Sequence, residues 1–150
     1  MDKSTFQNNV LEAETTMYRI SMSMLQSEAD CADAVSEAIL KAYEKLPSLR
    51  NERYFKTWLI RILINECNKI LRSKQHFAPL DEETGFCEND YSDLYEALNK
   101  LDTKIRLTVT LYYIEGYSVE EIKNILKIPA GTVKSRLARG RKLLKAHLEV

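Results

Sequence analysis

Hydrophobic residues along the first half of the chain recur every three or four positions, which is the spacing of one face of an α-helix. Two such patterns cover residues 6–24 and 29–46, and Pro47 marks the end of the second. A polar loop follows over residues 49–54, and a third helical pattern covers about residues 56–74. Together these patterns predict an N-terminal module of three helices.

Within each pattern, the hydrophobic positions indicate the side of the helix that faces a core. They are Phe6, Val10, Ala13, Met17, Ile20 and Met24 in the first helix, Cys31, Ala34, Val35, Ala38, Ile39, Ala42 and Leu46 in the second, and Trp58, Leu59, Ile62, Leu63, Ile70 and Leu71 in the third.

Helical periodicity stops after residue 74 and returns at residue 94. The stretch over residues 75–93 contains a proline, a glycine and, from Asp81 to Asp93, six acids and no base. We expect a flexible acidic linker there. No segment alternates like a β-strand, so the predicted fold is all-α, with two small helical domains over residues 1–74 and 94–150.

The second domain contains the pattern of a helix-turn-helix unit. After short helical patterns over residues 94–101 and 105–114, Gly116 stands where a left-handed C-terminal cap belongs. Ser118 and Glu121 have the spacing of a capping box that begins the next helix. Pro129 then breaks that helix and lies at the start of another.

The last helix is basic, with seven Lys or Arg residues and one acid over residues 127–150. Such a helix enters the DNA major groove in helix-turn-helix proteins, although a solvated basic helix at the end of a bundle is the simpler alternative. Val133, Leu137 and Leu144 are predicted to face the core. The predicted base-contacting face consists of Lys134, Ser135, Ala138 and Arg139, and the flanking residues Thr132, Arg136 and Arg141 suit phosphate contacts.

A second polar face follows one side of the third helix. This face consists of arginine and asparagine, whose side chains pair with base edges. An ordinary solvated face would instead favour Glu and Lys. Beside the polar loop, Tyr54, Phe55 and Trp58 offer aromatic surface for unstacked bases, although core packing is the alternative for Phe55 and Trp58. The stripe consists of Arg61, Asn65, Asn68 and Arg72.

Composition and the absence of certain motifs reduce the number of possible function classes. The 150 residues are 45% hydrophobic with a net charge of zero, so the chain is folded and is not a generally basic nucleic-acid binder. No apolar run is long enough for a membrane span and no signal-peptide pattern is present, so we expect a cytoplasmic protein. Cys31, Cys67 and Cys87 match no metal or redox spacing. We therefore expect no metal, no cofactor and, without a phosphate loop or nucleophile constellation, no enzyme.

Four stretches resemble one protein family. Residues 30–43 (DCADAVSEAILKAY) and 54–62 (YFKTWLIRI) look like the core domain of bacterial RNA polymerase sigma factors. Residues 116–122 (GYSVEEI) and 131–139 (GTVKSRLAR) look like the family's second promoter-binding domain. Nothing recognisable of the domain between them in larger members is present. The resemblance is therefore to the extracytoplasmic-function (ECF) class of the sigma-70 family.

This resemblance implies roles for the faces described above. Residues 1–74 would form region 2, which binds core polymerase and recognises and melts the −10 element, and residues 94–150 would form region 4, which reads the −35 element. The polymerase-binding residues would be Asp33, Glu37 and Lys41, which would dock on the clamp of the largest subunit. The −10 element would be contacted by Asn51, Arg53, Tyr54, Trp58, Arg61, Asn65, Asn68 and Arg72, and the −35 element by the face of the last helix.

The resemblance also implies partners. They are core RNA polymerase, promoter DNA and an anti-sigma factor, which in this class is often anchored in the membrane and would hold the protein at its inner face. No small-molecule substrate is implied, and the regulon would be one of stress or envelope response. The rival prediction is a conventional helix-turn-helix regulator with residues 1–75 as a sensor or dimerisation domain.

Overall fold

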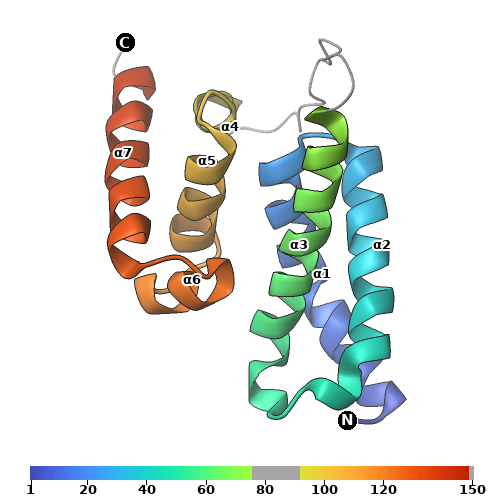
Figure 1. Ribbon diagram of the computed structural model, residues 1–150. Helices are drawn as coiled ribbons and strands as arrows, with labels where there is room; N and C mark the ends of the chain where they lie inside the picture. The colour runs from blue at the N-terminus through green and yellow to red at the C-terminus, as the bar shows by residue number, and fades with distance from the viewer. Residues whose placement is uncertain (76–91, 149–150) are drawn as a thin grey trace. The chain divides into compact units, whose positions relative to one another are not determined.

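The computed structural model describes residues 1–75 and 92–148, and it divides the chain into two compact units, Met1–Thr84 and Gly85–Val150. All regular structure in the described residues is helical, which confirms the predicted all-α fold (Figure 1). Residues 76–91, most of the predicted linker, lie outside the described residues. Both ends of the predicted linker are helical, because Gln75 is the last residue of one helix and Ser92 is the first residue of the next.

The first unit is a bundle of three helices, each of which packs against the other two (Figure 1). They are α1 (Lys3–Leu25), α2 (Glu28–Lys45) and α3 (Phe55–Gln75). Two single 3₁₀ turns, η1 (Leu46–Ser48) and η2 (Glu52–Tyr54), connect α2 to α3. The predicted polar loop is therefore partly ordered by hydrogen-bonded turns.

Local side-chain hydrogen bonds define where α1 and α2 begin and end. The Asp2 carboxylate accepts the N–H of Thr5 at 2.7 Å, and the Ser27 hydroxyl accepts the N–H of Asp30 at 3.3 Å. Both residues are N-caps, which satisfy N–H groups that have no partner within the helix. Between them, Gln26 closes α1 in the left-handed conformation, with a φ of 54°. This conformation turns the chain tightly from α1 into α2.

The predicted core positions of α1 and α2 are confirmed, except that Val10, Ile39 and Leu46 are only half-buried. In α3 the prediction is partly wrong, because Trp58, Ile62, Ile70 and Leu71 are also half-buried. Since α3 contacts two helices, its buried surface is wider than one hydrophobic stripe. It includes Ile60, Ile64 and Cys67, which the periodicity did not single out.

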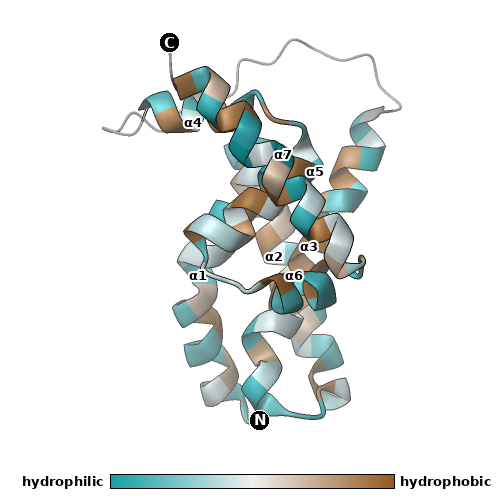
Figure 2. Cartoon of the chain, turned by 90° about the vertical axis from the view of Figure 1, so that its left-hand side faces the viewer, coloured by the Kyte–Doolittle hydropathy of each residue, from teal (hydrophilic) through white to brown (hydrophobic). Residues whose placement is uncertain are grey.

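The second unit is built around its last helix, α7 (Ala130–Leu148), which packs on α4 (Ser92–Asn99), α5 (Thr103–Val109) and α6 (Val119–Leu126). A π-helical turn, η3 (Thr110–Ile114), extends α5. Hydrophobic and hydrophilic residues alternate along the ribbons of these helices, as expected when one side of each faces a core (Figure 2).

At Gly140, which is buried, α7 approaches α5 closely. A Cβ atom on Gly140 would lie 2.5 Å from Cγ2 of Val109 and 3.2 Å from Cγ2 of Ile105. The missing side chain thus lets α7 lie directly against α5. Sequence periodicity did not indicate this contact. In the described part of the chain, no helix is long and apolar enough to cross a membrane.

Candidate nucleic-acid interface

The turn before α7 has the local structure that the sequence predicts. The N–H of Glu121 donates to the Ser118 hydroxyl, and the N–H of Ser118 donates to the Glu121 carboxylate, each at 3.1 Å. This capping box fixes the start of α6. Gly116 has a φ of +79° and Lys127, which ends α6, has a φ of 55°. The carbonyl of Pro129 then accepts the first backbone bonds of α7.

The side chains of α7 divide into a buried side and an exposed side. Val133 and Leu137 are buried as predicted, Leu144 is half-buried, and Gly140 completes the contact with α5. The four residues predicted to contact bases are all exposed on the opposite side. They are Lys134, Ser135, Ala138 and Arg139.

The three flanking residues differ in their surroundings. Thr132 and Arg136 are half-buried, whereas Arg141 is exposed. The Arg141 guanidinium donates a hydrogen bond from Nη1 to the hydroxyl of Tyr113 at 3.1 Å. Tyr113 lies in η3 and was not among the predicted site residues, because nothing in the sequence pattern indicates a contact across 28 positions.

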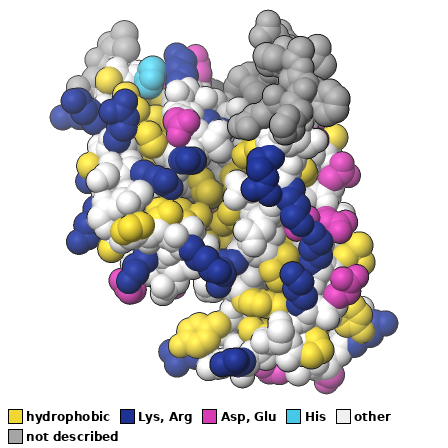
Figure 3. All heavy atoms as spheres, viewed as in Figure 1, with side chains coloured by type: hydrophobic (Ala, Val, Ile, Leu, Met, Phe, Trp, Pro, Cys, Tyr) yellow, Lys and Arg dark blue, Asp and Glu magenta, His cyan; other side chains and the backbone are white. Residues whose placement is uncertain are grey.

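The predicted polar stripe of α3 lies on one exposed side of that helix. Asn65 and Arg72 are exposed, and Arg61 and Asn68 are half-buried. They are turned away from Leu59 and the rest of the core, because residues three or four apart share one side of a helix. Figure 3 shows Lys and Arg side chains on the face of the first unit that is turned to the viewer. The stripe is therefore accessible to a ligand without unfolding.

Aromatic residues beside the stripe separate into core and surface. Phe55 is only 4% exposed and makes ring contacts with Phe6 at 5.7 Å and Trp58 at 5.9 Å between centroids, so core packing is confirmed for Phe55. Trp58 is half-buried, whereas Tyr54 is 58% exposed in the turn before α3. Asn51 and Arg53 are exposed in the same turn, where the Asn51 side chain accepts the Arg53 N–H at 3.0 Å.

The acidic side of α2 carries the residues predicted to bind polymerase. Asp33 and Glu37 are exposed, but the Lys41 ammonium lies 2.8 Å from the carboxylate of Glu66 on α3. Glu66 also pairs with Lys69 at 3.2 Å, and its side chain is only 8% exposed. Burial alone would raise the pKa of Glu66, but hydrogen bonds and charge attraction from the two lysines outweigh it and lower the pKa.

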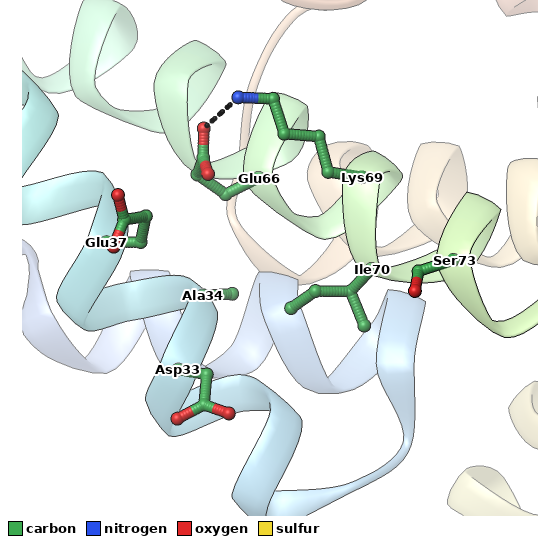
Figure 4. A pocket seen from close by; sticks show the side chains of 7 residues that line it. All are labelled: Asp33, Ala34, Glu37, Glu66, Lys69, Ile70 and Ser73. Atoms are coloured by element: carbon green, nitrogen blue, oxygen red, sulfur yellow. Dashed lines mark hydrogen bonds and ion pairs between the residues drawn. The ribbon is translucent and has the colours of Figure 1, made fainter.

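Glu66 is a residue that the sequence analysis missed, although it is the one acid in α3. A shallow hollow of about 270 Å³ lies beside it between α2 and α3 (Figure 4). The Asp33 and Glu37 side chains stand on the α2 side of this hollow (Figure 4). It is lined by Asp33, Ala34, Glu37, Glu66, Lys69, Ile70 and Ser73.

Each unit also buries a titratable group, Cys67 in the first and Arg106 in the second. Arg106 is 5% exposed and donates to the carbonyl of Leu101 at 2.6 Å and to the hydroxyl of Thr103 at 3.3 Å. Burial lowers the pKa of Arg106 and raises the pKa of Cys67 to about 12. In the described part of the chain, no group of His, Cys, Asp and Glu is arranged to hold a metal ion.

Comparison with known proteins identifies the family. The family model "Sigma-70 region 2" matches residues 11–77, and "Sigma-70, region 4" matches residues 91–144. RNA polymerase sigma factor SigV of Bacillus subtilis is 31% identical, over 93% of this chain and 88% of the relative. The ECF RNA polymerase sigma factor SigW of the same organism is also 31% identical, over 98% of this chain and 90% of the relative.

A solved structure agrees. The sigma factor RpoE from Bartonella quintana, crystallised in complex with the anti-sigma factor NepR, has a TM-score of 0.82 and 26% identity, with 97% of this chain and 98% of that chain covered. The fold and sequence thus define a transcription initiation factor. The chain belongs to the sigma-70 family, in its extracytoplasmic-function subfamily. The rival prediction is not favoured, because residues 11–77 match region 2.

Proposed function

We propose that this sigma factor binds core RNA polymerase and holds promoter DNA at two surfaces, one in each helical unit. Residues 1–74 would bind polymerase and melt the −10 element, residues 94–150 would read the −35 element as duplex, and residues 75–93 would tether them. The observation that carries the proposal is that each unit exposes a polar face opposite its core. These faces are the Arg61–Arg72 stripe of α3 and the Lys134–Arg139 face of α7.

The α7 face supplies the side chains needed for reading duplex DNA. Lys134 and Arg139 are exposed cations of the type that pair with guanine, and Ser135 can bond to several bases. Ala138 suits apolar contact with a thymine methyl group. Thr132, Arg136 and Arg141 would contact the phosphates on either side, which fixes the register of the helix on the duplex.

The α3 face and the turn before it suit a different ligand, the unpaired DNA strand. Unstacking costs a few kcal/mol per base step, and stacking on an aromatic ring returns about 1–3 kcal/mol per base. Tyr54 is exposed enough to act as such a ring, and Trp58, in the first turn of α3, is half-buried. Polar contacts would come from Asn51 and Arg53 in the turn and from Arg61, Asn65, Asn68 and Arg72 on α3.

The acidic side of α2 is the proposed contact with the clamp of the polymerase largest subunit. Asp33 and Glu37 would supply its exposed charges. Because Lys41 is already paired with Glu66, we assign it to the border of this surface, where it links α2 to α3. Exposed charges at such a rim speed association more than they strengthen the final complex.

We also propose an anti-sigma factor as a partner, because the similar RpoE structure is a complex with one. An anti-sigma factor would keep the protein inactive until an envelope or stress signal releases it. Where that partner is anchored in the membrane, this chain would be held at its cytoplasmic side, and after release it would act in the cytoplasm.

Transcription from a defined template tests the proposal. Core polymerase with the purified chain should give run-off transcripts from a promoter mapped by overproducing the protein, and core polymerase alone should not. Replacing Lys134 and Arg139 by Ala should abolish these transcripts, whereas Lys104→Ala, an exposed cation of α5, should not. Duplex binding that starts no transcript would instead support a conventional regulator.

A further inference from the structure

A hydrogen bond connects the flank of α7 to the π-helical turn η3. Nη1 of Arg141 donates to the hydroxyl of Tyr113 at 3.1 Å, and both side chains reach solvent, with Tyr113 51% exposed. The bond therefore lies on the surface of the second unit. A stabilising contact would gain little there, because exposed hydrogen bonds compete with water.

The backbone of η3 is irregular where this bond forms. The N–H of Glu115 donates to the carbonyl of Thr110, and the N–H of Tyr117 donates to that of Leu111, each at 2.9 Å. These steps of five and six residues replace the four-residue step of an α-helix. Such π-helical turns occur often at functional sites, because they alter where the side chains point.

The Tyr113 ring is itself held in place. It packs edge-to-face on Tyr112, with 4.8 Å between the ring centroids and 79° between the planes. Arginine, by contrast, has many rotamers and loses about 2 kcal/mol of conformational entropy when it is fixed. When the Tyr113 hydroxyl accepts a hydrogen bond from Arg141, it restrains the guanidinium before a ligand arrives, so binding costs less conformational entropy.

Arg141 lies on the side of α7 that carries the base-contacting residues. It follows Lys134 by seven residues, so it points within about 20° of the same direction and lies about 10 Å further along the helix axis. Its guanidinium has five N–H donors, of which the bond to Tyr113 uses one. The exposed remainder has the geometry to bind a phosphate at the edge of the groove.

We propose that Tyr113 is a positioning residue, whose hydroxyl orients Arg141 toward a phosphate of the DNA backbone. This inference rests on the proposed reading of duplex DNA by α7. It assigns to η3 a part in DNA binding that does not require Tyr113 itself to touch DNA.

The test measures the affinity of the full chain, bound to core polymerase, for promoter DNA at several salt concentrations. Arg141→Ala should weaken binding and reduce the slope of log K against log salt by about 0.9, because one phosphate contact is lost. Tyr113→Phe should weaken binding roughly threefold to tenfold and lose part of that slope. The double variant should bind no more weakly than Arg141→Ala alone.

Tyr112→Phe is the matched control, and it should bind like the wild type. The inference is overturned if Tyr113→Phe binds like the wild type, or if the losses from Tyr113→Phe and Arg141→Ala are additive. In either case a loss of binding in Lys134→Ala would leave the proposed function standing. A wild-type holoenzyme that fails to bind any mapped promoter would overturn both.

Discussion

At the scale of single residues, the carboxylate of Glu66 connects α2 and α3, the two helices on which we propose the polymerase surface and the −10 promoter surface. Its partners are Lys41 of α2 and Lys69 of α3. A buried charge is costly unless it is paired, so removing the charge at Glu66 leaves two lysines without their acceptor. The consequence should be visible as a stability that depends on pH.

The pKa of Glu66 is lowered from 4.5, so the folded state binds this proton less readily than the unfolded state does. The resulting stability is present above the unfolded pKa and is lost as pH falls through the folded pKa. We expect Glu66→Gln to lower the urea midpoint at about pH 7, and this deficit to shrink between about pH 5 and pH 3. Glu37→Gln, an exposed control on α2, should show little deficit at either pH. A Glu66→Gln deficit that is constant with pH would contradict the ion-pair account.

At Tyr117 of the second unit, in contrast to Glu66, no described residue offsets the burial of the polar group. Its hydroxyl is buried and has no hydrogen-bond partner among the described residues, and burial raises its pKa to about 12. Because an unsatisfied hydroxyl costs free energy, Tyr117→Phe should raise the stability of the second unit by about 1 kcal/mol. Thermal unfolding followed by circular dichroism checks this, with Tyr95→Phe as an exposed control. A lower melting temperature for Tyr117→Phe would mean that the hydroxyl has a partner after all.

At the scale of the elements, hydrophobic periodicity predicts most of the helices, because one side of each is buried against neighbours. The capping box at Ser118 and the left-handed Gly116 are local, and their residues alone predict them. The wider buried surface of α3 and the acceptor Glu66 depend on which helices pack together. That information is spread over the whole chain, so periodicity within one segment does not contain it.

The candidate site, too, has features that the sequence predicts and features that depend on packing between segments. Exposure of the α7 face follows from the spacing of Val133 and Leu137, which the sequence shows directly. The bond between Tyr113 and Arg141 depends on η3, and no residue pattern distinguishes a π-helical turn from the α-helix before it.

A substitution at Gly140 tests the packing of α7 on α5. Alanine is favoured over glycine inside a helix by about 1 kcal/mol, but its Cβ would collide with the stiff Val109 side chain. Overpacking costs about 1–3 kcal/mol, so Gly140→Ala should destabilise the second unit. Gly131→Ala, in the same helix with nothing within 4 Å of the added Cβ, should not. Equal thermal stability of the two variants would contradict the close approach.

At the scale of the whole molecule, the two surfaces should fail in different ways. Replacing Lys134 and Arg139 by Ala should prevent the holoenzyme from binding promoter duplex. Replacing Arg61 and Asn65 by Ala should leave a complex that binds but does not open, because these residues face the proposed unpaired strand. Gel-shift assays measure binding, and the fluorescence of a 2-aminopurine placed in the −10 element measures opening. Loss of duplex binding in the α3 variant would contradict the assignment of duplex binding to α7 and of promoter opening to α3.

The main role proposed for this chain is to direct core polymerase to open a promoter. Permanganate, which oxidises unpaired thymines, measures opening directly on a mapped promoter. We predict reactive thymines near the start site only when core polymerase and the chain are present together. Protection of the promoter as closed duplex by the chain alone, with no reactive thymines after polymerase is added, would contradict the account.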